Sequence, residues 1–482
     1  MTITVPADLP VPEPLVPTDL PALRAAVTGP VLVPGDPGLA DEITPFNLAA
    51  RHRPDVVVAA TSTADVAAAV GWAAASRLPV AVQATGHGAE VGVAGGLLIT
   101  TGRMRSVSVD PVARTARIAA GARWADVIAA AAPHGLAPLS GSSPDVGAVG
   151  YLLGGGLPIL GRAFGFGADL VRSCVAVTAD GRVRQVDAGS EPELFWALRG
   201  GRGAFAVVTE MTLDLLPLRS IYGGLLLYPG DAAPAVLHRW REWVATLPDE
   251  TCTSVAIMRF PDAPFVPEPL RGRCVVALRV AHVGPAEEGA RLLAPMRTVA
   301  PLLEDAVTEM PYAASAAIYR DPTTPVPSEH RGATLRELPV EAVDALLAVA
   351  GPQAASPLVV VELRHLGGAL AREPRIPNAV PARDAAFNLL TRGVLVPPVV
   401  DAIPAAAQAV HAALSPWAAR GCLLTFLGAA DTDAMADVWP EEVYARLRRV
   451  KADYDPHEVF RQGHRIPPAP FVPRPSEAVA AS

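Results

Sequence analysis

Apolar and amphipathic stretches alternate along the first part of the chain. The runs Asp55–Ala60 and Leu78–Gln83 are mainly apolar and predict buried strands. The segment Thr63–Ala75 between them is rich in Ala and Val and predicts a helix, with Thr63 as its N-cap. A strand, a helix and a second strand in this order predict a parallel strand pair with a crossover helix.

The rest of this first part predicts short elements joined by turns. We expect helices at Leu20–Val27, Ala122–Ala132 and Glu191–Leu198, strands at Leu97–Thr100, Ser106–Val109 and Thr115–Ala120, and a hairpin over Val175–Val186. Asp180-Gly181 is a strong signal for the turn of that hairpin.

The pattern changes after Pro217, where Gly-rich loops become rare. We expect helices at Ala233–Thr246, Pro285–Val299, Val340–Ala350 and Pro440–Tyr454, strands at Ser254–Arg259, Arg273–Val283 and Pro357–Leu366, and loops at Pro322–Pro327 and Pro374–Pro381, at the mouth of a pocket. Helices that alternate with mostly antiparallel strands indicate an α+β fold for this part.

Composition and charge exclude several classes of protein. The chain has 482 residues, of which 51% are hydrophobic and 18% charged, so we expect two or more packed domains. A net charge of −8 gives a nucleic-acid partner no electrostatic support. No apolar run reaches the roughly 18 residues that span a bilayer, and the first residues lack a signal-peptide pattern. We therefore expect a cytoplasmic protein with no membrane partner.

Several catalytic motifs are missing from the sequence. The four cysteines form no C-x-x-C pair, and the ten histidines are scattered without an H-E-x-x-H motif, so we expect no metal site. A G-x-S-x-G nucleophile elbow is also absent, which leaves a hydrolase little support.

The loop Gln83–Gly96 follows the second predicted strand and places His87 between two glycines. Glycines allow main chain to approach a ligand closely, and consecutive N–H groups can form an anion-binding nest. Because α/β folds bind ligands at the carboxyl ends of strands, we expect this loop to hold a phosphate with one imidazole beside it. Taken alone, so short a motif also fits a tight turn with an incidental histidine.

A second Gly-rich block covers residues 140–167 and contains the run Gly154-Gly155-Gly156. The block is more apolar than a flexible linker, so we expect its backbone to approach a flat or phosphorylated ligand. A third Gly-rich turn begins at Arg199 and runs into a strand.

Together these motifs resemble the berberine-bridge-enzyme-like flavoproteins of the vanillyl-alcohol-oxidase fold, with a PCMH-type FAD-binding domain. The resemblance covers most of the chain and is densest over Arg53–Leu216, with the Gly-His loop, Ser-Pro-Asp-Val-Gly, Leu-Gly-Gly-Gly, Val-Thr-Ala-Asp-Gly and Glu-Leu-Phe-Trp-Ala-Leu-Arg-Gly-Gly. Leu366–Arg372 and Lys451–Phe460 resemble the later signatures of the family. The order and spacing of these pieces carry the resemblance more than any single one.

The resemblance implies an α+β, two-domain fold in which the flavin domain is split and a central antiparallel sheet, covered by helices, forms the substrate domain. We therefore expect an N-terminal segment at 1–50, flavin-binding parts at 51–218 and 439–470, a substrate domain at 219–438 and a mobile tail at 471–482.

The cofactor implied by the resemblance is FAD. The residues expected to contact it are Ala84, Thr85, Gly86, His87, Gly88, Ala89, Gly141, Ser142, Ser143, Val146, Gly147, Gly150, Tyr151, Gly154, Gly155, Gly156, Val207 and Tyr454. In the family, the histidine of the Gly-His motif bonds covalently to the 8α carbon of the isoalloxazine ring, so His87 is the implied attachment site. A neutral imidazole nitrogen is nucleophilic, as this bond requires.

The sequence departs from the family pattern at two positions. Many members form a second link through a cysteine just before Pro-x-Val-Gly, where this chain has Ser143, so we expect a single attachment. His464 stands where relatives often carry Asn or Gln, and either a flavin contact or a surface position fits it. A small residue at Val146 is associated in the family with oxygen reaching the flavin, which favours an oxidase.

Hydride transfer to a flavin leaves a proton that a base must accept. The candidates are Tyr151, Glu362, Arg364, His365 and Tyr444. Glu362 and Arg364 are two residues apart in a predicted strand and so face the same side. That pair suits substrate binding or deprotonation, and equally a structural ion pair. Tyr444 corresponds to a tyrosine that relatives often place near the flavin, or it faces outward on the last helix.

The leading hypothesis is an FAD-dependent oxidase that takes a hydride from an alcohol, sugar or amine carbon of a small secondary metabolite and passes the electrons to molecular oxygen. We expect a monomer or a homodimer. The alternatives are a flavin-containing cyclase, isomerase or dehydrogenase that does not use oxygen, and a binding protein with degenerate loops. An NAD-dependent enzyme has little support, because the glycines do not follow the first strand as G-x-G-x-x-G.

Overall fold

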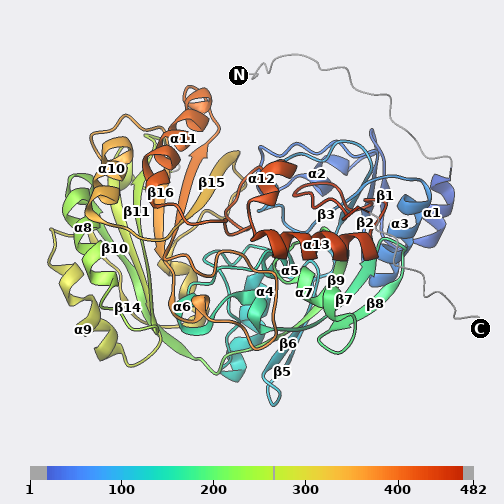
Figure 1. The fold of residues 1–482 in the computed structure, drawn as a ribbon, viewed down its shortest axis with the longest axis horizontal. Coiled ribbons are helices and arrows are strands. Elements are labelled where there is room, and N and C mark those ends of the chain that lie inside the picture. Colours follow the sequence, from blue (N-terminus) through green and yellow to red (C-terminus); the bar gives the residue numbers. More distant parts are fainter. Residues whose placement is uncertain (1–18, 264–265, 471–482) are drawn as a thin grey trace, which may run out of the picture.

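A computed structural model describes residues 19–263 and 266–470 and shows two halves side by side (Figure 1). The first half is built on a four-stranded and a five-stranded sheet, and the second on one eight-stranded sheet. The expected tail at 471–482 and residues 1–18 of the expected N-terminal segment lie outside the described residues. No helix in the described part of the chain is long and apolar enough to cross a bilayer.

The four-stranded sheet has the order β1-β2-β4-β3 and lies next to the cavity described below. Its strands are β1 (Val31–Leu32), β2 (Val56–Ala59), β3 (Val80–Gln83) and β4 (Leu97–Thr100). The predicted strands β2 and β3 are parallel in direction but not paired, because β4 lies between them and pairs with both. The crossover helix α3 spans Thr63–Ala75 as predicted, but its N-cap is Ser62, whose hydroxyl accepts the Asp65 N–H.

The five-stranded antiparallel sheet completes the first half, with the order β5-β6-β9-β7-β8. Its strands are β5 (Val107–Asp110), β6 (Thr115–Ala119), β7 (Val171–Thr178), β8 (Val183–Asp187) and β9 (Ala206–Asp214). The helices of this half are α1 (Leu20–Ala26), α2 (Leu39–Ile43), α4 (Trp124–Ala131), α5 (Ala148–Leu153), α6 (Gly161–Phe164) and α7 (Pro192–Leu198). The predicted hairpin is thus β7–β8.

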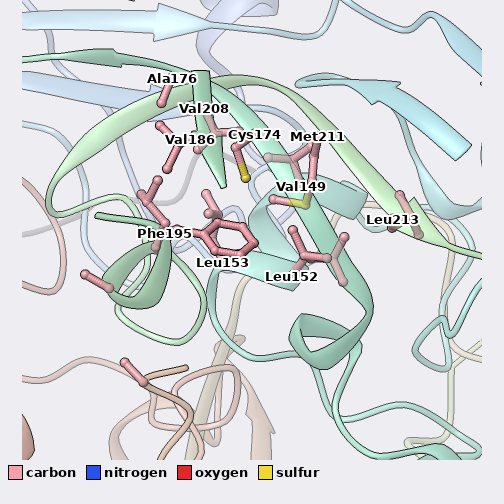
Figure 2. Packing of buried hydrophobic residues seen from close by; sticks show 14 of the residues in the cluster. Val149, Leu152, Leu153, Cys174, Ala176, Val186, Phe195, Val208, Met211 and Leu213 are labelled. Atoms are coloured by element: carbon pink, nitrogen blue, oxygen red, sulfur yellow. The ribbon is translucent and has the colours of Figure 1, made fainter. Parts of the chain in front are cut away.

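The core of this half forms between the five-stranded sheet and the helices beneath it (Figure 2). Leu152 and Leu153 from α5 and Phe195 from α7 pack against Cys174 on β7 and Met211 on β9. Because α5 lies within the second Gly-rich block, this packing fixes the block in place. Cys174 is a buried free thiol within this core.

The eight-stranded sheet of the second half is antiparallel throughout, with the order β13-β10-β12-β11-β16-β17-β15 and β14 also paired to β10. Its strands are β10 (Ser220–Pro229), β11 (Thr251–Arg259), β12 (Cys274–His282), β13 (Glu304–Asp305), β14 (Thr308–Pro311), β15 (Ser328–Leu335), β16 (Val360–His365) and β17 (Phe387–Val394). Strands β10, β15 and β17 were not predicted from the sequence.

Helices α8 (Ala233–Val244), α9 (Ala286–Arg297), α10 (Val340–Ala350) and α11 (Ile403–Leu414) cover the outer face of this sheet, on the left of Figure 1. Helix α11 was also not predicted. The chain then returns to the first half through α12 (Thr432–Ala436) and α13 (Glu441–Tyr454), coloured red, and α13 packs against α7. The Val80 N–H on β3 donates to the Val459 carbonyl, so the end of the chain joins the first sheet.

Candidate active site

A cavity of about 1290 Å³ lies between the two halves. It is lined by the loop after β3, the second Gly-rich block, the start of β9, the inner face of the eight-stranded sheet and the returning segment at residues 460–464. Cavities for a single ligand usually measure about 300–1,000 Å³. The volume therefore has room for an extended cofactor and a small substrate together.

His87 lies in the cavity wall with its ring held on two sides. Phe46 stacks on it, with ring centroids 3.8 Å apart and an angle of 11° between the planes. The Thr85 hydroxyl lies 2.8 Å from Nδ1. Nε2 is buried, and no residue in the described ranges forms a hydrogen bond with it. Burial lowers the pKa of His87 to about 4, so the ring is neutral at pH 7.

Most of the residues predicted to contact the cofactor line this cavity. They are Ala84, Thr85, Gly86, His87, Gly88, Ala89, Gly141, Ser142, Ser143, Val146, Gly147, Gly150, Tyr151 and Val207. The loop and the second Gly-rich block come together because the Gly147 N–H donates to the Thr85 hydroxyl, 3.3 Å away. No cysteine is among the described lining residues, and the Ser143 hydroxyl is buried there without a protein partner.

Four of the predicted cofactor contacts lie elsewhere. The run Gly154–Gly156 does not line the cavity, because protein side chains fill the space beside it. A Cβ on Gly155 would lie 3.3 Å from Val380, and one on Gly156 would lie 2.3 Å from the Tyr151 ring. These glycines therefore let protein side chains approach closely and do not admit a ligand. Tyr454 is also outside the lining, and its hydroxyl donates to Glu191.

Glu362 lies on the sheet face that lines the cavity and is 2% exposed. Its carboxylate contacts Arg279 at 2.9 Å and Arg364 at 2.8 Å, and accepts a hydrogen bond from Ser254 at 2.8 Å. Although burial opposes ionisation, the two arginines hold the pKa of Glu362 below its usual value. A carboxylate so strongly stabilised is a weak base, so the geometry fits the ion-pair alternative.

The remaining base candidates are less well placed. Tyr151 lines the cavity, but burial raises the pKa of its hydroxyl well above the ordinary value. His365 lies outside the cavity with Nε2 3.2 Å from Arg162, and burial lowers its pKa to about 3. Tyr444 stacks on Trp439 outside the cavity, and burial raises its pKa.

A buried pair that the sequence analysis missed joins the two halves across the cavity. Glu90, three residues after His87, has its Oε1 atom 3.2 Å from Nδ1 of His330 on β15, and both side chains are 8% exposed. Burial raises the pKa of Glu90 to about 7, although Arg202 and Arg392 oppose this, and Glu329 adds to the rise. The position of Glu90 inside the His87 loop was the one signal in the sequence.

Two further residues around this pair are basic and line the cavity. Arg202 comes from the third Gly-rich turn and contacts Nδ1 of His464 at 2.7 Å. His464 is held from its other side, since Nε2 lies 2.8 Å from the Gly428 carbonyl. This answers the question that the sequence left open, because His464 lines the cavity and is not a surface residue.

These observations fit a bound flavin. The volume of the cavity is sufficient for FAD and a substrate together, and Gly-rich loops line one side of it. The neutral ring of His87 has a buried Nε2 without a hydrogen-bond partner among the described residues. When bound, FAD would supply the hydride acceptor. The fold and the site thus define a two-domain flavoprotein.

Comparison with known proteins agrees with this class. A family model described as an FAD binding domain matches residues 54–187, and one described as berberine and berberine like matches residues 425–467. The chain is 28% identical over 465 residues to (R)-6-hydroxynicotine oxidase of Paenarthrobacter nicotinovorans, covering 93% of this chain and 98% of the relative. It is 27% identical over 464 residues to the FAD-linked oxidoreductase YgaK of Bacillus subtilis (strain 168), covering 92% and 98%.

Solved structures show the same fold. The crystal structure of 6-hydroxy-D-nicotine oxidase from Arthrobacter nicotinovorans matches with a TM-score of 0.79 and 25% identity, over 91% of this chain and 98% of that one. Xylooligosaccharide oxidase from Myceliophthora thermophila has a TM-score of 0.80 at 19% identity, over 93% and 99%, which supports the fold alone. The chain thus carries an FAD-binding domain and a berberine-like segment, and it is similar in sequence and fold to FAD-linked oxidoreductases.

Proposed function

We propose that this protein is an oxidase that carries FAD on one covalent bond to His87, takes a hydride from a C–H bond next to oxygen or nitrogen in a small molecule, and passes the electrons to molecular oxygen. The free, buried Nε2 of His87 in the wall of the cavity carries this proposal. Val146 at the cavity supports use of oxygen, and the absence of a lining cysteine among the described residues supports a single bond.

The alternative is a dehydrogenase or cyclase that retains the flavin but does not use oxygen. A solved structure of similar fold, the grass pollen allergen Phl p 4, is described as having glucose dehydrogenase activity. The oxidase and the dehydrogenase can be distinguished with a panel of candidate substrates: (R)- and (S)-6-hydroxynicotine, xylobiose, chitooligosaccharides and glucose. Reduction of the flavin with stoichiometric oxygen consumption supports the oxidase, and reduction that an artificial acceptor but not oxygen reverses supports the dehydrogenase.

His87→Ala should abolish acid-stable flavin. After acid precipitation the yellow colour should stay with the wild-type pellet and leave with the supernatant in the variant, because only a covalent bond survives denaturation. Phe46→Leu is a matched control, since it removes the stacked ring but keeps the imidazole. Colour released from the wild-type protein would leave a flavoprotein and remove the histidyl bond from the proposal.

We further propose that Glu90 accepts the substrate proton. Its carboxyl group lines the cavity 3.2 Å from Nδ1 of His330, and its Oε1 atom forms no hydrogen bond with the described residues. Burial raises the pKa of Glu90 to about 7, so its carboxylate can take up a proton near neutral pH, whereas a pKa of about 3 makes the His330 imidazole a weak base. Glu90 is therefore active as a base above a pH of about 7.

Glu90→Gln should slow reduction of the flavin roughly 10²-fold or more, the usual contribution of a positioned base. The measurement is the anaerobic reduction rate, between pH 5 and 9, with whichever compound of the panel reduces the wild-type flavin fastest. The wild-type rate should rise with a midpoint near pH 7, and the variant should lose this rise. Glu341→Gln, an exposed residue in the first turn of α10 and outside the cavity lining, is the control. An unchanged pH profile in Glu90→Gln would remove Glu90 from the reaction.

A further inference from the structure

The two ring nitrogens of His87 have different surroundings. Nδ1 lies 2.8 Å from the Thr85 hydroxyl oxygen, whereas Nε2 has no hydrogen-bond partner among residues 19–263 and 266–470. Phe46 covers one face of the ring in near-parallel stacking. Turning the ring over about the Cβ–Cγ bond would put Cδ2 in the place of Nδ1 and break the Thr85 contact, so the stacked ring and the hydroxyl together favour one orientation.

The Thr85 hydroxyl is itself held in position from a second segment. The Gly147 N–H at the start of α5 donates to Thr85 Oγ1, 3.3 Å away. A hydroxyl carries one donor and two acceptor sites. It can therefore accept from Gly147 and still either accept from Nδ1–H or donate to a bare Nδ1.

This freedom matches what the imidazole must do. Before a bond forms, the Nδ1–H tautomer donates to Thr85 and leaves the lone pair on Nε2. After Nε2 is alkylated, the remaining lone pair lies on Nδ1 and accepts the Thr85 O–H. Burial keeps the pKa of His87 near 4, so one nitrogen carries a lone pair at pH 7. The hydrogen bond to Thr85 is thus satisfied in both states.

We propose that Thr85 is a positioning residue that reserves Nε2 of His87 for the bond to the 8α carbon of FAD. This rests on the covalent attachment proposed above. In the net step, the histidine loses its ring proton and the 8α methyl group loses one C–H bond as the N–C bond forms. The two protons and two electrons reduce the flavin, and molecular oxygen reoxidises it with release of hydrogen peroxide.

The test compares Thr85→Val, which keeps the size but removes the hydroxyl, with Thr85→Ser, which keeps the hydroxyl. The first readout is the acid-stable fraction of flavin, measured from purification over time in the flavin-loaded proteins. The second is the bonded nitrogen, identified by long-range ¹H–¹⁵N correlation on the flavin-bearing peptide from protein labelled with ¹⁵N-histidine. Neither readout needs a substrate.

We expect attachment through Nε2 in the wild-type protein and in Thr85→Ser. Thr85→Val should form the bond at least tenfold more slowly or give a mixture of the two nitrogens. Attachment through Nδ1 in the wild-type protein, or the same rate and same nitrogen in Thr85→Val, would overturn the role of Thr85. Thr85→Ala serves the same purpose if the valine variant does not fold. A wild-type protein without acid-stable flavin would instead overturn the covalent attachment itself.

Discussion

Lys451→Ala should lower the free energy of unfolding by about 3–5 kcal/mol, the usual cost of leaving one member of a buried ion pair without its partner. Lys451 on α13 and Asp455 are both fully buried and in contact. The Lys451 ammonium also donates to the carbonyls of Ala204 and Phe460, at 2.7 and 2.9 Å. Asp455 in turn accepts the N–H groups of Val459 and Phe460.

This network joins the third Gly-rich turn to the returning segment, and both of these line the cavity. Chemical denaturation of the flavin-loaded protein measures the effect, and the variant should also release noncovalent flavin more readily. Arg446→Ala is the control on the same helix, because its ion pair with Glu193 is exposed to solvent and should contribute less than about 1 kcal/mol. A loss below 1 kcal/mol in Lys451→Ala would contradict the importance of this network.

A second large effect is expected on acidification below pH 6.5. His330, His365, His411 and His464 all have pKa values that burial lowers, to about 3 for the first two and about 4 for the others. In the unfolded chain these groups take up protons near pH 6.5, whereas the folded protein keeps them neutral. Their stabilising contribution is therefore complete above pH 6.5 and is lost as the pH falls towards 4.

The loss is about 1–2 kcal/mol for each histidine at pH 5, so the four together are comparable with the whole stability of a typical domain. Thermal unfolding between pH 8 and 4 checks this expectation. His411→Gln, outside the cavity lining, should move the acid transition to lower pH, whereas the exposed His457→Gln should not. A transition that is the same in the wild-type protein and His411→Gln would contradict the assignment.

Local signals in the sequence were sufficient for part of the fold and the site. The helix Thr63–Ala75 and the strand Leu97–Thr100 are observed with the predicted bounds. Both could be predicted because a continuous apolar pattern marks the residues that are buried. His87 was identified because it stands between two glycines in a loop that directly follows a predicted strand. Each of these features can be predicted from residues that are close together in the sequence.

Other features depend on contacts that the sequence does not display. Strand β17 was missed because the polar residues Asn388 and Arg392 interrupt its apolar sequence. Both residues lie on the inner face of the sheet. A run of glycines does not show whether a ligand or a protein side chain occupies the space that a glycine side chain leaves open. At Gly156 the ring of Tyr151 occupies that space. The Glu90–His330 contact joins residues 240 positions apart, and no local pattern signals such a pair.

The hydrogen bond between Val80 and Val459, and the position of His464 in the cavity wall, also bear on how the protein is made. The ribosome synthesises the loop around His87 early. The segment that closes the cavity, at His464, follows nearly 380 residues later. A nascent chain therefore cannot enclose its cofactor until His464 has been synthesised.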